Sequence, residues 1–209
     1  MAKQVGGILG PVRGKVSNVV GARWKETPYF RAYAIPANPK TTLQTQQRAR
    51  MTACVWMAKA LLGPIINPYW DPFTKTMYGY NRFCQVNLKL LGQPIDYLKT
   101  LITEGKLEPT PAVISATYDP TLPNVTIVFS ATCMGNGLPT DSVIACVLDV
   151  VNNVAFFTIG DGTRTEASTF AAVGTGRTVA NLKAFVGFYR GAGSTLMVSS
   201  SVSRQVTAS

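Results

Sequence analysis

The hydrophobic pattern of the chain changes from helical spacing to strand-like alternation near residue 108. Residues 38–108 place apolar side chains three or four positions apart, which predicts amphipathic helices. From Pro109 onward, short alternating runs are separated by turn residues, which predicts β-strands. The expected fold is therefore α+β, with a glycine-rich basic arm over 1–37, a helical hairpin over 38–108 and an antiparallel β-sandwich over 109–209.

The arm contains two β-prone runs, residues 15–20 and 23–33, and predicts a β-ribbon that ends at Pro36. Gly21 and Ala22 are expected to make the turn between the runs. Cations and aromatic side chains interleave here, a combination that binds phosphate and stacks on bases. A strand with one buried face would give the same spacing. The residues concerned are Arg23, Trp24, Lys25, Tyr29, Phe30, Arg31 and Tyr33.

A first helix is predicted from Thr41, which forms a capping-box pattern with Gln44, to about Leu62, before Gly63 and Pro64. Its expected buried stripe is apolar at helical spacing. The stripe comprises Leu43, Met51, Cys54, Val55, Ala58, Leu61 and Leu62. Arg48 and Lys59 lie eleven positions apart on one flank, which is expected to face either solvent or phosphate.

Residues 65–78 are rich in proline and large aromatic side chains and predict a packed loop or a subunit contact. A second helix is expected over residues 79–91, because apolar side chains recur on one face. Gly92 follows where a left-handed residue commonly ends a helix, and Pro94 comes soon after. The two helices should pack as a hairpin.

Seven strands are predicted in the carboxyl-terminal part, which is typical of an immunoglobulin-like or fibronectin-type sandwich of about 100 residues. The Cys-Trp-Cys signature of antibody domains is absent, so the expectation concerns architecture only. The predicted strands are residues 112–118, 124–132, 142–150, 153–159, 168–173, 178–190 and 194–206.

Charged residues are distributed unevenly between the two halves of the chain. Residues 1–107 hold fifteen of the twenty Lys and Arg residues but four of the ten acidic ones, a net charge of +11, whereas the remainder carries −1. The basic half is expected to face nucleic acid, through residues 1–60, or an acidic protein. Candidate contacts are Lys3, Arg13, Lys15, Arg23, Lys25, Arg31 and Arg48.

The chain offers little catalytic chemistry. It has no histidine, which removes the commonest general base and metal ligand. The segment 10–17 lacks the spacing of a phosphate-binding P-loop. Its four cysteines match no zinc pattern and are expected to be buried free thiols. We therefore expect no enzymatic activity, metal, cofactor or small-molecule substrate.

Several features favour an assembled protein that does not use a membrane. Only 14% of residues are charged, which suggests that other subunits cover part of the surface. No signal-peptide pattern and no apolar run of about 20 residues is found, so the chain is expected to be made in the cytoplasm.

The arm residues Gly10, Pro11, Arg13, Gly14 and Lys15 resemble the amino terminus of a family of uncharacterised proteins from bacterial and phage genomes. Further motifs extend the resemblance over most of the chain. They are Val20-Gly21, Trp24-Lys25 with Arg31, Asn38-Pro39-Lys40-Thr41 with Gln44 and Arg48, Gly79-Tyr80-Asn81 with Phe83 and Asn87, Thr140-Asp141-Ser142, Gly162-Thr163-Arg164, and the strand through Phe185 to Tyr189.

This resemblance implies a non-enzymatic structural protein of a phage virion, as a capsid, decoration or tail component. The partners would be further copies of the chain and other virion proteins, held by apolar anchors. The candidate anchors are Trp24, Tyr29, Phe30, Trp70 and Phe73. A nucleic-acid-binding protein and a bacterial adhesive module are the alternatives.

Overall fold

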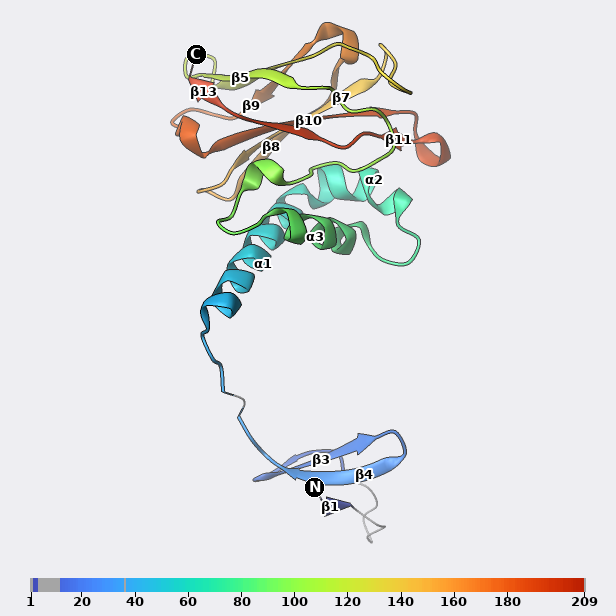
Figure 1. Ribbon diagram of the computed structural model, residues 1–209, viewed down its shortest axis with the longest axis vertical. Helices are drawn as coiled ribbons and strands as arrows, with labels where there is room; N and C mark the ends of the chain where they lie inside the picture. Colours follow the sequence, from blue (N-terminus) through green and yellow to red (C-terminus); the bar gives the residue numbers. More distant parts are fainter. Residues whose placement is uncertain (1, 4–11, 36, 209) are drawn as a thin grey trace. The chain divides into compact units, whose positions relative to one another are not determined.

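The computed structural model describes residues 2–3, 12–35 and 37–208 and divides into two compact units, Met1–Thr41 and Thr42–Ser209 (Figure 1). The first unit is a small β-sheet, and the second combines helices with two further sheets. The α+β class predicted from the sequence is confirmed. The predicted boundary at residue 108 lies inside the second unit.

Three antiparallel strands build the first unit: β2 (Gly14–Val16), β3 (Val19–Trp24) and β4 (Thr27–Ala32). The two-residue strand β1 (Ala2–Lys3) extends the sheet at β4. Two-residue turns at 17–18 and 25–26 join the three strands, and Ser17 and Lys25 open these turns with positive φ.

The predicted turn at Gly21 and Ala22 is wrong, because both residues lie within β3. Glycine is needed at position 21 for a different reason. A Cβ atom there would collide with the carbonyl group of Val12, whose carbon would be 2.9 Å away. Gly21 therefore allows a close backbone approach within the sheet.

The first predicted helix is confirmed as α1 (Thr42–Leu61), which ends just before Gly63 and Pro64. The chain continues through a π-helical turn, Leu62–Ile66, into the short helix α2 (Asn67–Tyr69). Proline cannot donate the usual helical hydrogen bond, and a locally widened turn accommodates it. A 3-10 turn, Asp71–Phe73, follows, so much of the predicted loop over 65–78 is helical.

The predicted stripe of α1 is only partly correct. Cys54, Ala58 and Leu61 are buried, but Leu43 and Met51 are exposed, as is Leu62 in the π-helical turn. Periodicity identifies an apolar face but not how far along the helix another element covers it. Among the described residues, other elements bury only the second half of α1, in which the first buried residue is Ala53.

The second predicted helix is confirmed as α3 (Gly79–Leu90), and it packs against α1. Gly92 has φ of 62°, the left-handed conformation expected after a helix end. A 3-10 turn, Tyr97–Lys99, then leads into an extended connector.

Strands occur in all seven predicted regions, and they form two sheets. The outer sheet has the order β13-β5-β6-β9, with β13 parallel to β5. The central sheet has the order β11-β10-β7-β8, and β12 also pairs with β10. The outer strands are β5 (Val113–Asp119), β6 (Asn124–Phe129), β9 (Ser168–Ala172) and β13 (Thr207–Ala208). The central strands are β7 (Ser142–Asp149), β8 (Val154–Thr163), β10 (Leu182–Arg190), β11 (Met197–Val198) and β12 (Val202–Gln205).

The central sheet is covered on both faces. Val143, Ala145 and Val147 of β7 pack in one core with the outer sheet, whereas Ile144 and Cys146 pack in a second core with the helices (Figure 1). This explains why β7 reads as a nearly continuous apolar run. The structure supports helices with two carboxyl-terminal sheets, one of them mixed, and does not establish an immunoglobulin-like sandwich.

The connector between the helices and the strands is held from both sides. Asn87 of α3 accepts a hydrogen bond from Leu101 N at 2.7 Å and donates to Leu101 O at 2.9 Å. Trp70 Nε1 donates to Ile102 O at 2.9 Å, and Ile102 N donates to Ser201 Oγ at 2.8 Å. These hydrogen bonds join the helices and the sheets within the compact unit Thr42–Ser209.

The combined helical stretch Thr42–Tyr69 has the length and apolar composition to cross a membrane, with a mean hydropathy of 1.2 over its best window. The expectation that no apolar run approaches a spanning length is corrected, because the helix continues past Pro64 and joins two apolar segments. Of that window, 39% is buried inside the molecule, and core helices of soluble proteins pass the same test. The observation is weak support for a membrane role.

Candidate binding faces of the amino-terminal sheet

The described residues contain no group of three or more His, Cys, Asp or Glu side chains that could hold a metal ion. Cys54, Cys84 and Cys146 are buried free thiols as predicted, but Cys133 is exposed, which corrects that expectation for one residue. A hydrogen bond with the Cys84 side chain, together with burial, raises the pKa of the Cys54 thiol. Burial also raises the pKa of Cys146. These two thiols are held protonated, so they are poor nucleophiles.

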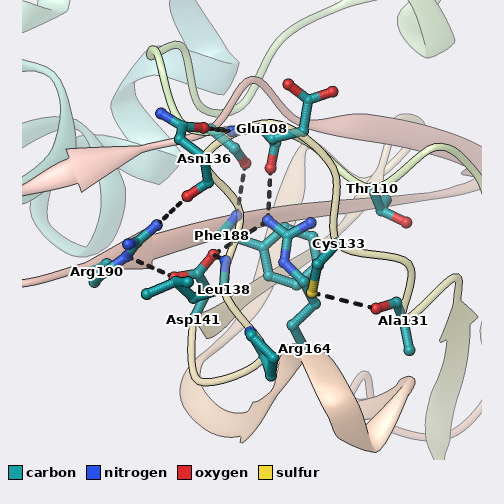
Figure 2. A network of polar contacts seen from close by, with 12 residues as sticks. Glu108, Thr110, Ala131, Cys133, Asn136, Leu138, Asp141, Arg164, Phe188 and Arg190 are labelled. Carbon is teal, nitrogen blue, oxygen red and sulfur yellow. Dashed lines mark hydrogen bonds and ion pairs between the residues drawn. The ribbon is translucent and has the colours of Figure 1, made fainter.

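The most elaborate polar cluster surrounds Asp141 (Figure 2). Its carboxylate pairs with Arg190 Nε at 2.7 Å and with Arg164 Nη2 at 3.4 Å, and it accepts a hydrogen bond from Leu138 N at 2.8 Å. The side chains of Asp141 and Arg164 are fully buried. Arg190 also donates to the Asn136 carbonyl at 2.5 Å.

Arg164 ties this cluster to the rest of the second unit. Its Nη2 donates to the Glu108 carbonyl at 2.5 Å, and its guanidinium lies 4.0 Å from the ring centroid of Phe188. Nε and Nη1 have no partner among the described atoms, and the ring offsets part of that cost. The cluster holds the loop over 134–141 against β10, so its geometry indicates a structural clamp.

A groove with a volume of about 700 Å³ lies between residues 69–77, 104–106 and 196–198. Trp70 lines it but is only 2% exposed and packs edge-on against Phe83. The prediction that Trp70 is a subunit contact is corrected, because this side chain belongs to the core. Phe73 is 48% exposed and remains accessible.

The strand register sorts the amino-terminal sheet into two chemically different faces. Lys15 pairs with Val20 and Val20 with Arg31, so these side chains share one face, and their next neighbours point the other way. The basic face carries Lys15, Val20, Ala22, Trp24, Thr27, Tyr29 and Arg31, and Tyr33 contacts Lys15 just beyond β4. The apolar face carries Val16, Val19, Gly21, Pro28, Phe30 and Ala32, with Arg23 near its end.

Most described side chains of both faces are exposed or half-buried, and the backbone of Val12 lies against Gly21 on the apolar face. Among the described residues of this unit, Gly21 alone is buried. Trp24 is 72% exposed on the basic face, and Val16 is 59% exposed on the apolar face, while Tyr29 and Phe30 are half-buried. So many exposed large side chains are unusual on a sheet this small, which makes it the strongest candidate site among the described residues.

The predicted cationic residues fall at different places. Lys15 Nζ lies 3.7 Å from the Tyr33 ring centroid, and the exposed Arg31 occupies the same face. Arg23 pairs with Glu26 at 3.4 Å. Arg13, Arg23 and Lys25 line a shallow hollow at the other end of the sheet. Lys3 pairs with Tyr29 in backbone register, and its side chain lies outside the described residues. Arg48 lies on α1, in the second unit.

The family of unknown function DUF6266 matches residues 11–203. The chain belongs to that family. The match covers both units and confirms the resemblance to an uncharacterised family, but it shows no association with phages or virions. No curated protein and no solved structure matches the chain.

Three residues of the motifs singled out in the sequence have structural roles in the second unit. Asp141 and Arg164, from separate motifs, form the buried ion pair, and Asn87 holds the connector. Sequence reasoning missed the apolar face of the first sheet, with Val16 and Val19. The signal was present in the polar dipeptides at 17–18 and 25–26, which mark the true turns and hence the register.

Proposed function

We propose that this protein is a non-enzymatic structural subunit that self-associates through the apolar face of its amino-terminal sheet. One observation carries the proposal: a four-stranded sheet whose apolar face leaves Val16 59% and Val19 41% exposed. A sheet this small needs a packed face to be stable. Covering Val16, Val19 and Phe30 would supply that packing.

A second copy of the chain is the partner that the charges favour. Two apolar faces can pack against each other about 10 Å apart, as in a β-sandwich, with two-fold symmetry. This arrangement turns both basic faces outward, so their like charges stay apart. Arg23, the cation on the apolar face, is already paired with Glu26. The proposal is an assembly role, and the family match does not tie it to a virion.

We further propose an immunoglobulin-like arrangement for the second unit. In chain order, its first, second and fifth long strands, β5, β6 and β9, share one sheet, while β7 and β10 lie in the other. Immunoglobulin domains separate the corresponding strands in the same way. The fourth strand, β8, joins the β7 sheet, which differs from the constant-type domain. An immunoglobulin-like second unit would suit a domain exposed on the surface of the assembly.

Analytical ultracentrifugation of a double variant tests the assembly role. Val16→Gln with Val19→Gln makes the apolar face polar without changing its charge and should convert an oligomer to the 22.5 kDa monomer. Val151→Gln, at a 63% exposed position in the second unit, is the matched control and should leave the oligomer intact. A wild-type protein that stays monomeric at high concentration, or a double variant that stays oligomeric, would overturn the proposal.

A further inference from the structure

We propose that the basic face of the amino-terminal sheet binds single-stranded nucleic acid. This inference is independent of the apolar face, because the two faces carry different residues and can be altered separately. It rests on three features of the described residues: the clustering of cations, the lack of acidic groups and the exposure of aromatic rings.

The cations of the basic face are placed in a row across the sheet. Lys15, Val20 and Arg31 are cross-strand neighbours, so the cations lie two strands apart, roughly 10 Å, with an apolar residue between them. Such a row can follow a phosphate backbone across the strands.

No acidic residue opposes this charge within the first unit. Residues 1–41 contain seven Lys and Arg residues and one acid, Glu26, which is bound to Arg23 at 3.4 Å. Neither Lys15 nor Arg31 forms an ion pair among the described residues. Both cations are exposed, so they are available to an anionic ligand.

Aromatic rings on the same face favour the binding of a nucleic acid, whose bases can stack on them, over a polyanion without bases. Trp24 is 72% exposed and Tyr29 lies beside the small residue Ala22, whereas one side of the Tyr33 ring is occupied by Lys15 Nζ, 3.7 Å from the ring centroid. A base can stack on such a ring only when it is not already stacked in a duplex. The combination therefore selects a single strand.

Fluorescence anisotropy with a labelled oligothymidylate tests the cations. The wild-type protein should bind at low salt, and its affinity should fall as salt rises. Lys15→Ala with Arg31→Ala should weaken binding by about tenfold or more. The matched control, Lys89→Ala with Lys106→Ala, removes the same charge from exposed positions in the second unit and should have little effect. Equal losses in the two double variants would overturn the proposal.

Substitution of Trp24 separates a nucleic acid from other polyanions. Trp24→Ala should weaken oligothymidylate binding about five- to a hundredfold, whereas Trp24→Phe should retain most of it. Heparin, a polyanion without bases, should bind more weakly than the oligonucleotide and be insensitive to Trp24→Ala. Heparin binding equal to that of the oligonucleotide, with no effect of Trp24→Ala, would show a general anion surface and contradict the proposal.

The Val16→Gln, Val19→Gln variant keeps failures of the two proposals apart. It alters only the apolar face, so a monomeric variant should still bind the oligonucleotide with its salt dependence retained. Loss of oligonucleotide binding in the Lys15, Arg31 variant, with the oligomer intact, is the complementary result. If the basic-face variant dissociates the oligomer and leaves binding unchanged, the assignment of the two faces is wrong.

Discussion

At the residue scale, Asp141 joins three parts of the second unit through one buried carboxylate. It satisfies two arginines and a backbone N–H group while its own side chain is fully buried. A buried ion pair adds little net stability as a whole, but removing one partner leaves an uncompensated charge. The structure therefore predicts a strong dependence on this single carboxylate.

Asp141→Asn should lower the free energy of unfolding by about 3–5 kcal/mol, because it leaves the buried Arg164 guanidinium without a counter-charge. Urea denaturation measures the change. Asp161→Asn, at an exposed position in β8, should change stability by less than about 0.5 kcal/mol. If Asp141→Asn changed the free energy of unfolding as little as Asp161→Asn, the buried ion pair would not be a structural clamp.

Asp149 predicts an acid-sensitive contribution to stability. Burial would raise its pKa, but hydrogen bonds from Asn152, Val151 and Arg177 outweigh burial and hold the pKa below the ordinary value of 3.8. A lowered pKa in the folded state means that the stabilisation is present above pH 3.8 and is lost as the pH falls further. Asp149→Asn should therefore flatten the fall in stability below about pH 4, measured by denaturation at several pH values. An unchanged slope would contradict this assignment.

At the element scale, turn residues and alternation predicted the strands of the second unit and the start of α3. Errors arose where a residue type has more than one structural use. Glycine at position 21 allows the backbone of Val12 to approach closely and does not form a turn. Pro64 follows the end of α1 as predicted, but it lies in a π-helical turn and not in a loop. The exposed Leu43 shows that an apolar stripe does not reveal which part of it will be covered.

Gly79→Ala tests the start of α3. An added Cβ atom would lie 2.6 Å from Asp71 Oδ1 and 2.9 Å from Trp70 Cβ, so the helix start should be overpacked and the free energy of unfolding lowered by about 1–3 kcal/mol. Gly63→Ala, where nothing lies within 4 Å, should be neutral or stabilising by up to about 1 kcal/mol. Thermal or urea denaturation of the two variants checks the contrast, and equal effects would refute the close packing at Gly79.

At the scale of the whole molecule, composition alone predicted a basic amino-terminal half and a nearly neutral carboxyl-terminal half. It could not divide the candidate residues between faces, because the division depends on strand register, and a shift of one residue reverses every side chain. It also could not distinguish Trp24, which is 72% exposed, from Trp70, which is in the core. Burial of Trp70 depends on Phe83 and on the connector at Ile102, which are distant in sequence.

The central claim is that the amino-terminal sheet is stabilised by a second copy of the chain. Hydrogen exchange of the wild-type protein at several concentrations tests this most directly. Amides of Val19–Trp24 and Thr27–Ala32 should be protected at high concentration and lose protection on dilution, while those of Ser142–Asp149 stay protected throughout. Protection of the amino-terminal sheet that does not depend on concentration, in a protein that remains monomeric, would contradict the account.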